Sequence, residues 1–361
     1  MKPNFFYLSL VVFIIFGSCS EDENLTPTPT PTGSNIVIVN YDIFTPSVWD
    51  DDSIYIIEND VKIDAVLTIE PGTIVKFKPD ASLQLWDNGT INAVGIKDTV
   101  ILFTSIKDDT GGDSNGDLSA TKPRNGDWNM IDLGVQNGSK FKYCIFTYGG
   151  GGGNTGVLDL GSNSSTVKHC VFKNNKSTVS SNEFYGALAA QDANTSTVIT
   201  DNFFYDNTVP LSIDAHLSID NSNNFYNPET KEGGNKYNAI FVHGQDIISS
   251  SVTWRETEVA YVIQYDAFDL WDGYALTLGD NVVIKFITNA YFNIQQGAVI
   301  NNHQGEGVYF TSFKDDSHKG DSNGDANATT PSANEWKGVY DSANSIYFQW
   351  ANILYSKNDN K

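Results

Sequence analysis

The chain carries little positive charge. Its 361 residues include 22 Lys and Arg against 44 Asp and Glu, and the only arginines are Arg124 and Arg255. Nucleic acids and polyanionic glycans are held by cationic surfaces that neutralise their phosphates or carboxylates. The composition therefore argues against both classes of partner.

The chain also lacks helical periodicity and long apolar runs. The predominantly apolar run at residues 5–16 is too short to cross a bilayer, which takes about 20 residues. Elsewhere, no stretch of useful length has apolar residues spaced three and four apart. Charged residues make up only 18% of the chain, whereas Gly, Asn, Ser, Thr and aromatic residues are frequent. This mixture is typical of short strands joined by turns, so we expect an all-β fold.

The first 34 residues are predicted to direct and anchor the protein. Lys2 precedes the apolar run, as in a signal peptide. The segment Phe16-Gly17-Ser18-Cys19 resembles the lipobox of bacterial lipoproteins, although a plain secretory cleavage site is the alternative. The resemblance implies that residues 1–18 are a signal peptide and that Cys19 is lipidated. Residues 19–34 would then begin with the lipidated cysteine and continue as a semi-rigid Thr/Pro linker.

The location of the protein is predicted from the same region. Residues 20–23, Ser-Glu-Asp-Glu, resemble the signal that sends lipoproteins of Bacteroidota to the outer face of the outer membrane. We therefore expect a cell-surface protein attached to the outer membrane through a lipid on Cys19.

A long duplication organises the rest of the chain. Four segments recur in the same order and at a nearly constant displacement, which indicates a duplicated module. These segments and their second copies are 67–77 and 276–286, 103–109 and 310–316, 113–117 and 321–325, and 127–128 and 335–336. We assign residues 35–238 to the first module and residues 239–361 to a second, partial copy.

A shorter repeat runs inside the first module. Two interleaved strand types recur about every 20 to 30 residues, as the coils of a parallel β-helix require. One type begins at Ile131, Leu158, Leu188, Leu211 and Ile240. Asn174, Asn175 and Asn207 follow the other type and are expected to form side-chain ladders through the turns.

These residues resemble the right-handed parallel β-helix proteins of the pectin-lyase-like class. The resemblance rests on the openings Leu-Thr-Ile-x-Pro-Gly and Phe-Thr-Ser, and it is greatest to surface lipoproteins of Bacteroidota. It implies a right-handed parallel β-helix over most of residues 35–361. It implies no particular activity, because the class contains lyases, hydrolases, binding proteins and inert stalks.

Apart from Cys19, the only cysteines are Cys144 and Cys170, which occupy equivalent places in consecutive coils. Their Cα atoms are expected about 5 Å apart, which permits a disulfide by distance. Buried thiols are favoured, because free cysteine often behaves as a small core residue. Neither has the neighbours of a zinc site.

The duplicated acidic loop is the strongest candidate site. Its alternating carboxylate and amide side chains offer the hard oxygen ligands that calcium prefers, and a structural calcium ion is the predicted cofactor. The candidate ligands are Asp108, Asp109, Asp113, Asn115 and Asp117 in the first copy and Asp315, Asp316, Asp321, Asn323 and Asp325 in the second. Each loop is similar to the first half of an EF-hand, but Leu118 and Ala326 stand where its glycine is expected, which excludes a complete EF-hand. A solvated polar turn is the alternative.

A second constellation lies along the predicted coils. If the strands stack as expected, Asp214 and His243 share one face, with Asp192 and His216 beside them. Carboxylates about 5 to 10 Å apart can act as acid and base in glycoside cleavage. Polar residues of these types also cover β-helix faces that have no catalytic role, and few cations lie nearby to serve a lyase. These four residues are therefore the candidate catalytic groups of an alternative function only.

Aromatic residues form a third group. Trp49 pairs with Trp254 and Trp128 with Trp336 across the duplication, so we expect these four to be structural. Trp86 and Trp271 have no such counterparts, which makes them the better candidates for sugar-stacking surfaces.

The sequence favours a lipid-anchored, calcium-stabilised β-helix that binds an extracellular glycan or surface protein without chemistry of its own. The alternatives are a polysaccharide-degrading enzyme on the same fold and a passive stalk.

Overall fold

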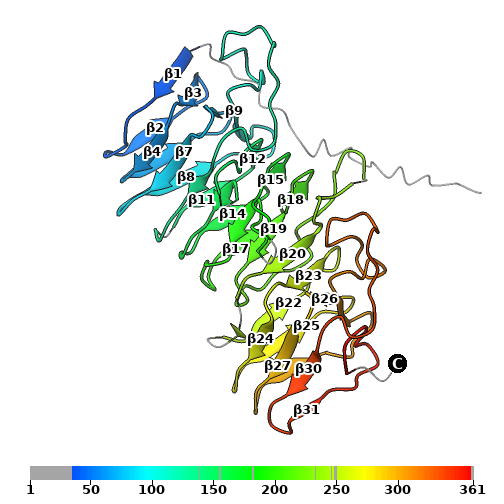
Figure 1. Ribbon diagram of the computed structural model, residues 1–361. Helices are drawn as coiled ribbons and strands as arrows, with labels where there is room; N and C mark the ends of the chain where they lie inside the picture. Colours follow the sequence, from blue (N-terminus) through cyan, green and yellow to red (C-terminus); the bar gives the residue numbers. More distant parts are fainter. Residues whose placement is uncertain are drawn as a thin grey trace, which may run out of the picture.

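The structure is a computed structural model that describes residues 35–136, 138–153, 156–180, 183–231, 233–244, 246–247 and 250–358. These residues form a right-handed parallel β-helix, with successive rungs stacked along one axis (Figure 1). The all-β prediction is confirmed, since the described residues form strands and turns without a helix. Accordingly, they include no helix that is long and apolar enough to cross a membrane. The predicted signal peptide, Cys19 and the linker lie outside the described residues.

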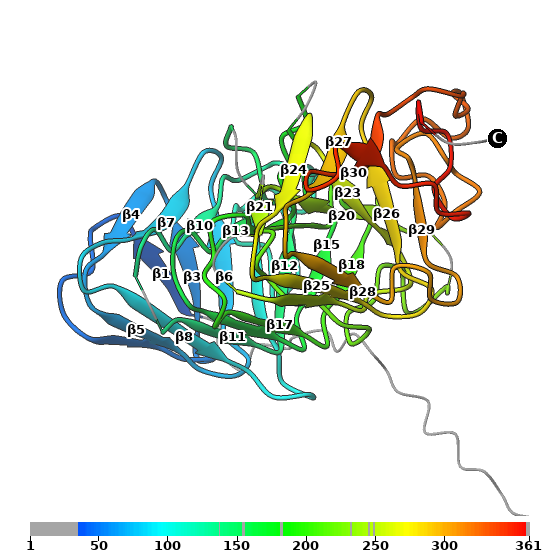
Figure 2. The ribbon, with the colours of Figure 1, turned by 90° about the horizontal axis from the view of Figure 1, so that it is seen from below.

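Three sheets enclose the core of the first copy (Figure 2). Sheet A contains β1 (Asn35–Val39), β3 (Ser53–Ile57), β6 (Ile74–Phe77), β9 (Ile101–Ser105), β12 (Cys144–Thr147), β15 (Val171–Lys173) and β18 (Phe203–Tyr205). Sheet B begins with β4 (Asp60–Ile63), β7 (Ser82–Leu85), β10 (Ile131–Asp132), β13 (Leu158–Asp159), β16 (Leu188–Ala190) and β19 (Leu211–Ile213). Sheet C contains β2 (Ser47–Trp49), β5 (Val66–Ile69), β8 (Thr90–Val94), β11 (Lys140–Lys142), β14 (Thr166–Lys168) and β17 (Val198–Thr200).

The second copy extends sheet B and adds two further sheets. Sheet B continues with β20 (Ala239–Val242), β23 (Ala260–Ile263), β26 (Val283–Phe286) and β29 (Tyr309–Ser312). Sheet D contains β21 (Asp246–Ile247), β24 (Ala267–Leu270), β27 (Tyr291–Ile294), β30 (Gly338–Asp341) and β31 (Ile346–Tyr347). Sheet E contains β22 (Val252–Trp254), β25 (Ala275–Leu278) and β28 (Val299–Asn301).

Stacked identical side chains fill the core, because in-register parallel strands place like residues one above another. In sheet A, Phe103, Phe146, Phe172 and Phe204 are fully buried, and their successive ring centroids lie 4.9, 4.7 and 5.1 Å apart. Such offset stacks add to the stabilisation that burial itself provides.

The predicted asparagine ladder is confirmed for two of its three members. Asn175 donates through Nδ2 to Asn207 Oδ1 at 3.0 Å, and Asn207 donates to Asn235 Oδ1 at 2.8 Å. Asn174 instead adopts a left-handed backbone conformation beside the ladder, with φ of 54°. The ladder satisfies buried amides that would otherwise cost free energy at the turns.

Corresponding strands of the two copies lie in different sheets. The corresponding strands β6 and β26 contain the segments Ile-Val-Lys-Phe and Val-Ile-Lys-Phe, yet β6 belongs to sheet A and β26 to sheet B. Asn224 pairs with Phe203 and so adds a last rung to sheet A. The chain then enters β20, which pairs with β23 as β1 pairs with β3 but stacks on β19 of sheet B.

The last strands are arranged differently from the others. Strand β31 pairs antiparallel with β30, whereas β30 pairs parallel with β27 on its other side. Residues 353–356 then return across the last rung, where Ile353 bridges to Phe310 and Ser356 to Trp336. The chain itself thus lies across part of this end of the β-helix.

Cys144 and Cys170 are free, fully buried thiols in the structure. The Cys144 thiol donates to the Ala93 carbonyl at 3.3 Å, and burial raises its pKa. The two cysteines therefore serve as core residues here.

Candidate metal centre

Both acidic loops leave the β-helix through the same local structure. Each follows a Thr-Ser strand end, in β9 or β29, and returns at a tryptophan that stacks on the strand beneath. Trp128 stacks on Phe77 with centroids 4.0 Å apart, and Trp336 stacks on Phe286 at 4.2 Å. Both ends of each loop are therefore fixed to the core.

A buried lysine holds each loop to the outer face of its sheet. Lys76 and Lys285 point outward from corresponding strands, and both are fully buried under the loops. Lys76 Nζ donates to the carbonyls of Asp108 and Gly112 at 2.6 and 2.7 Å. Lys285 Nζ donates to the Gly320 carbonyl and to Ser322 Oγ, both at 2.8 Å.

Burial lowers the pKa of both lysines, that of Lys285 to about 8, while nearby loop carboxylates favour the charged form. The ammonium groups thus provide both hydrogen bonds and counter-charge. Sequence reasoning missed these lysines. The available signal was a lysine at the same place in an otherwise apolar strand of both copies.

Three predicted ligands converge in each loop. Carboxylate oxygens of Asp109, Asp113 and Asp117 lie within 4.8 Å of one another. In the second copy the same holds for Asp316, Asp321 and Asp325.

Local hydrogen bonds shape these clusters. Asp113 accepts hydrogen bonds from the backbone N–H groups of Gly116, Asp117 and Leu118, and these bonds lower the pKa of its carboxyl. The hydroxyl of Thr121 likewise lowers the pKa of Asp117. Both carboxylates are consequently ionised at neutral pH, although their charges repel each other.

One carboxylate oxygen in each cluster is buried without a hydrogen-bond partner. These atoms are Asp109 Oδ1 and Asp316 Oδ1, and the amide oxygen Oδ1 of Asn323 in the second loop is also buried without a partner. Burial and the charge of Asp321 raise the pKa of Asp316. Buried oxygens of this kind usually have a partner, and a cation is one that suits all the acceptors present. The donor set is oxygen only, which fits calcium.

Asp108 and Asp315 lie outside the clusters. Each accepts a hydrogen bond at 2.6 Å from the threonine four residues before it, Thr104 or Thr311. Asp315 is also within 2.7 Å of His318 Nδ1. These two predicted ligands therefore hold the start of the loop. Asn115 and Asn323 lie inside the loops, and each donates to the last aspartate of its own cluster, Asp117 or Asp325.

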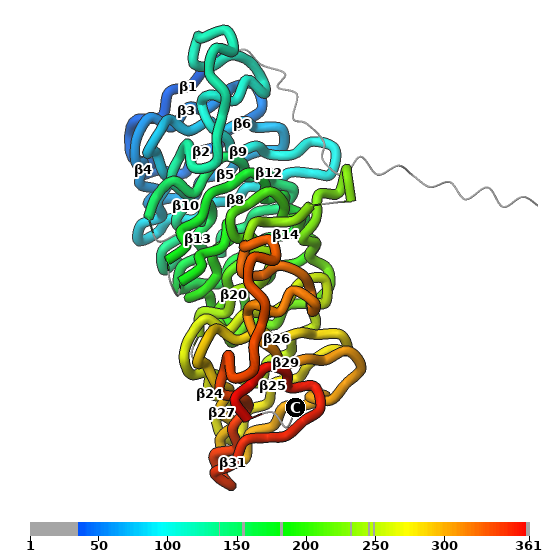
Figure 3. The backbone as a smooth tube through the Cα atoms, turned by 45° about the vertical axis from the view of Figure 1, so that its right-hand side comes forward, coloured from blue at the N-terminus to red at the C-terminus, as the bar shows by residue number. Residues whose placement is uncertain are grey.

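The two loops have different surroundings. The second loop reaches back to the end of the first copy, where the Asp321 carbonyl accepts from Asn238 N at 3.4 Å and Gly324 lies against the Tyr237 ring. Figure 3 shows this orange segment returning to the green strand β20. In the first loop, Gly116 has open space in the corresponding place, and Leu118 is 90% exposed.

The candidate catalytic residues lie near one another, since the charges of Asp192 and Asp214 act on His243, but of the four only Asp214 and His216 pair directly. Asp214 and His243 follow register partners in β19 and β20, as expected from stacking. However, Asp214 pairs with His216 at 2.6 Å, which raises the pKa of the imidazole, whereas His243 Nε2 lies 2.8 Å from the Phe184 carbonyl. Burial lowers the pKa of His243. Asp192 is exposed on the same face.

Sequence reasoning overlooked Asp159. It lies on sheet B as the register partner of Asp132, and burial together with the charges of Asp132 and Asp192 raises its pKa to about 6. The repeated segments Ile131-Asp-Leu-Gly134 and Leu158-Asp-Leu-Gly161 were the signal that could have found it.

The tryptophans separate into two groups. Trp49 and Trp254 are buried and stack on Tyr55 and Tyr261, both at 4.7 Å, and Trp128 and Trp336 are also buried. Trp86 and Trp271 are each 47% exposed.

No protein-family model matches the chain, and neither does any curated protein or solved structure.

Proposed function

We propose that this protein is a non-catalytic, calcium-stabilised β-helix that is anchored to the outer membrane and binds an extracellular glycan or surface protein. One observation carries the calcium proposal: in each copy, three carboxylates converge within 4.8 Å and one buried oxygen has no hydrogen-bond partner.

Electrostatics and size both support calcium. Oxygens on opposite sides of a calcium ion are separated by twice the metal–oxygen distance, or about 5 Å. A divalent cation would offset the repulsion among ionised carboxylates that local hydrogen bonds keep charged. The asparagines, backbone carbonyls and water would complete the coordination.

Calorimetric titration of metal-stripped full-length protein tests the proposal. Calcium should bind at two sites, and Asp113→Ala combined with Asp321→Ala should abolish binding. Magnesium serves as a control, because it requires a tighter octahedral arrangement. If stripped wild-type protein takes up no calcium at millimolar concentration, the loops are ordinary polar turns.

Anchoring and class membership rest on sequence. The lipobox ending at Cys19 supports the lipid anchor, and the acidic residues that follow support display at the cell surface of a member of the Bacteroidota. The Leu-Thr-Ile-x-Pro-Gly opening at residues 67–72 supports membership of the pectin-lyase-like class. Exposure of Trp271 supports ligand binding, since exposed indole rings can stack on sugars. Trp86 is equally exposed, but Lys62 Nζ lies over its ring, 3.9 Å from the centroid.

A polysaccharide-degrading enzyme is the second candidate. The observation favouring it is the pairing of Asp159 with Asp132 on neighbouring strands, where one carboxyl has a pKa of about 6. Strand spacing places the two residues about 5 Å apart, close to the separation in retaining glycosidases. If a broad polysaccharide screen reveals cleavage, Asp159→Asn or Asp214→Asn should reduce the rate at least about a hundredfold. Lack of cleavage by the wild type favours the binding function.

A further inference from the structure

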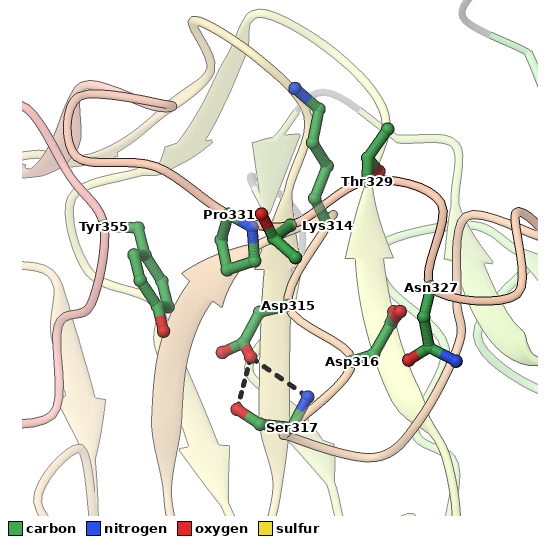
Figure 4. A pocket seen from close by; sticks show the side chains of 9 residues that line it. Lys314, Asp315, Asp316, Ser317, Asn327, Thr329, Pro331 and Tyr355 are labelled. Carbon is green, nitrogen blue, oxygen red and sulfur yellow. Dashed lines mark hydrogen bonds between the residues drawn. The ribbon is translucent and has the colours of Figure 1, made fainter.

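A hollow of about 320 Å³ opens beside the second acidic cluster (Figure 4). Tyr355 and Pro331 lie toward one side, and Asp316 and Asn327 toward the other, with Thr330 also lining it. The volume is at the lower end of the range for ligand pockets, about 300 to 1,000 Å³. The hollow therefore has room for a small ring.

In the first copy, side chains of the loop contact the carboxylate that corresponds to Asp316. Ser119 Oγ donates to Asp109 Oδ2 at 2.5 Å, and Lys122 Nζ lies 3.9 Å from the same oxygen. The second copy has Asn327 and Thr330 at these positions. The substitution of a neutral residue for Lys122 removes a competing cation and shortens the side chain beside the carboxylate.

The charges around the hollow restrict its ligand. Lys314 Nζ lies 3.1 Å from Glu335, and His318 lies against Asp315, so nearby basic groups already have acidic partners. The carboxylate of Asp316 also lines the hollow. The lining therefore disfavours anions and favours a neutral ligand that donates hydrogen bonds.

The opposite wall suits an apolar ring face. Tyr355 is held in a left-handed backbone conformation with φ of 58°, as is the corresponding Tyr148 with φ of 64°. The carbonyl of Tyr355 accepts from Glu335 N at 3.0 Å, which fixes the residue beside the loop. An aromatic ring opposite polar groups is a common arrangement for binding sugars, which combine C–H faces with hydroxyl edges.

We propose that this hollow binds a neutral sugar unit of an extracellular glycan. Tyr355 and Pro331 contact the face of the sugar ring, while Asp316, Asn327 and Thr330 contact its hydroxyl groups. The inference rests on the proposed function and gives the ligand class and its place. Calcium at the adjacent cluster fixes the Asp316 carboxylate, so sugar binding is stronger with calcium than with chelator.

Saturation-transfer NMR on the full-length protein tests this inference, using the methyl glycosides of galactose, mannose and N-acetylglucosamine, with galacturonic acid as the anionic probe. At least one neutral glycoside should bind in calcium. Thr330→Lys, which installs the residue of the first copy, should weaken binding at least about tenfold, or about 1.4 kcal/mol. Lys122→Thr is the matched control in the first copy and should leave this binding in place.

The other outcomes refute the inference. They are no binding of any neutral glycoside, equal binding by Thr330→Lys, or binding lost only in Trp86→Ala. Preferential binding of galacturonic acid, or of a lysine-rich peptide that calcium displaces, also refutes it. Calcium uptake is measured separately by calorimetry, so failure of the metal site is distinguished from failure of the sugar site.

Discussion

Neutralising one carboxylate in each cluster should stabilise the fold when calcium is absent and destabilise it when calcium is present. The variant is Asp109→Asn combined with Asp316→Asn. The replaced carboxylates each have one buried oxygen without a partner, and the asparagine side chain has nearly the same shape. By contrast, replacing Asp113 would also remove its hydrogen bonds to three backbone N–H groups.

The magnitude follows from the distances. Two unit charges separated by the 4.8 Å limit of each cluster repel by about 0.9 kcal/mol with water-like screening. Each substitution removes two of three such pairs, together with a weaker attraction to the buried Lys76 or Lys285, so without calcium the variant should be slightly more stable than wild type. At a hundredfold excess of calcium over Kd, each lost site costs about 2.7 kcal/mol. The order of stability should therefore reverse.

Thermal unfolding by circular dichroism, in chelator and in millimolar calcium, measures both effects. Wild type should melt at the lower temperature in chelator and at the higher temperature in calcium. Asp87→Asn is the control for a simple change of net charge. A variant that is less stable than wild type in chelator, or that responds to calcium as wild type does, would refute the reasoning.

Three further outcomes are expected. Cys19→Ala should move the protein from the membrane fraction to the soluble fraction, measured by fractionation and immunoblot, because acyl chains provide the proposed anchor; a variant that stays in membranes contradicts it. Glu256 is buried, its Oε2 has no hydrogen-bond partner, and burial raises its pKa to about 8. Between pH 5 and about 8 the folded state therefore binds more protons than the unfolded state, so stability should fall as the pH rises. Chemical denaturation of Glu256→Gln should show a smaller fall. Lys285→Met leaves buried acceptors unpaired and should lower the free energy of unfolding by about 1 to 3 kcal/mol. The control Lys78→Met removes a partly exposed ion pair and should lower it by at most about 1 kcal/mol. Similar losses in the two variants would rule out the anchoring role of Lys285.

The parts of the fold that could be predicted are those with a repeating apolar pattern. Sheets A and B repeat at nearly regular intervals and have large inward residues such as Phe146 and Phe172, so their strands stand out. The third strand type escaped notice because β11, β14 and β17 have three residues each. Each of these strands presents a single inward apolar residue, in order Phe141, Val167 and Ile199.

The acidic clusters were predictable because their geometry is local. Asp113 and Asp117 are four residues apart, and a tight turn at Gly116 brings them together with φ of 74°. To predict that Lys76 anchors the loop, two further facts are needed. Its side chain points away from the core, and a loop more than thirty residues later covers it. Neither fact can be read from the strand alone.

The way in which the two copies are joined explains why the two acidic loops, which are similar in sequence, have different surroundings. The first copy ends with a rung on sheet A. The first strand of the second copy, β20, corresponds to β1 of sheet A but stacks on β19 of sheet B. Corresponding strands of the two copies therefore lie on different sheets. The second loop consequently emerges over sheet B and packs on Tyr237 and Asn238 of the preceding coil. Within the described residues no coil precedes β1, and the first loop rises beside β1 (Figure 1). A cation in the second loop would therefore hold two copies together, whereas the same ion in the first would order only its own loop.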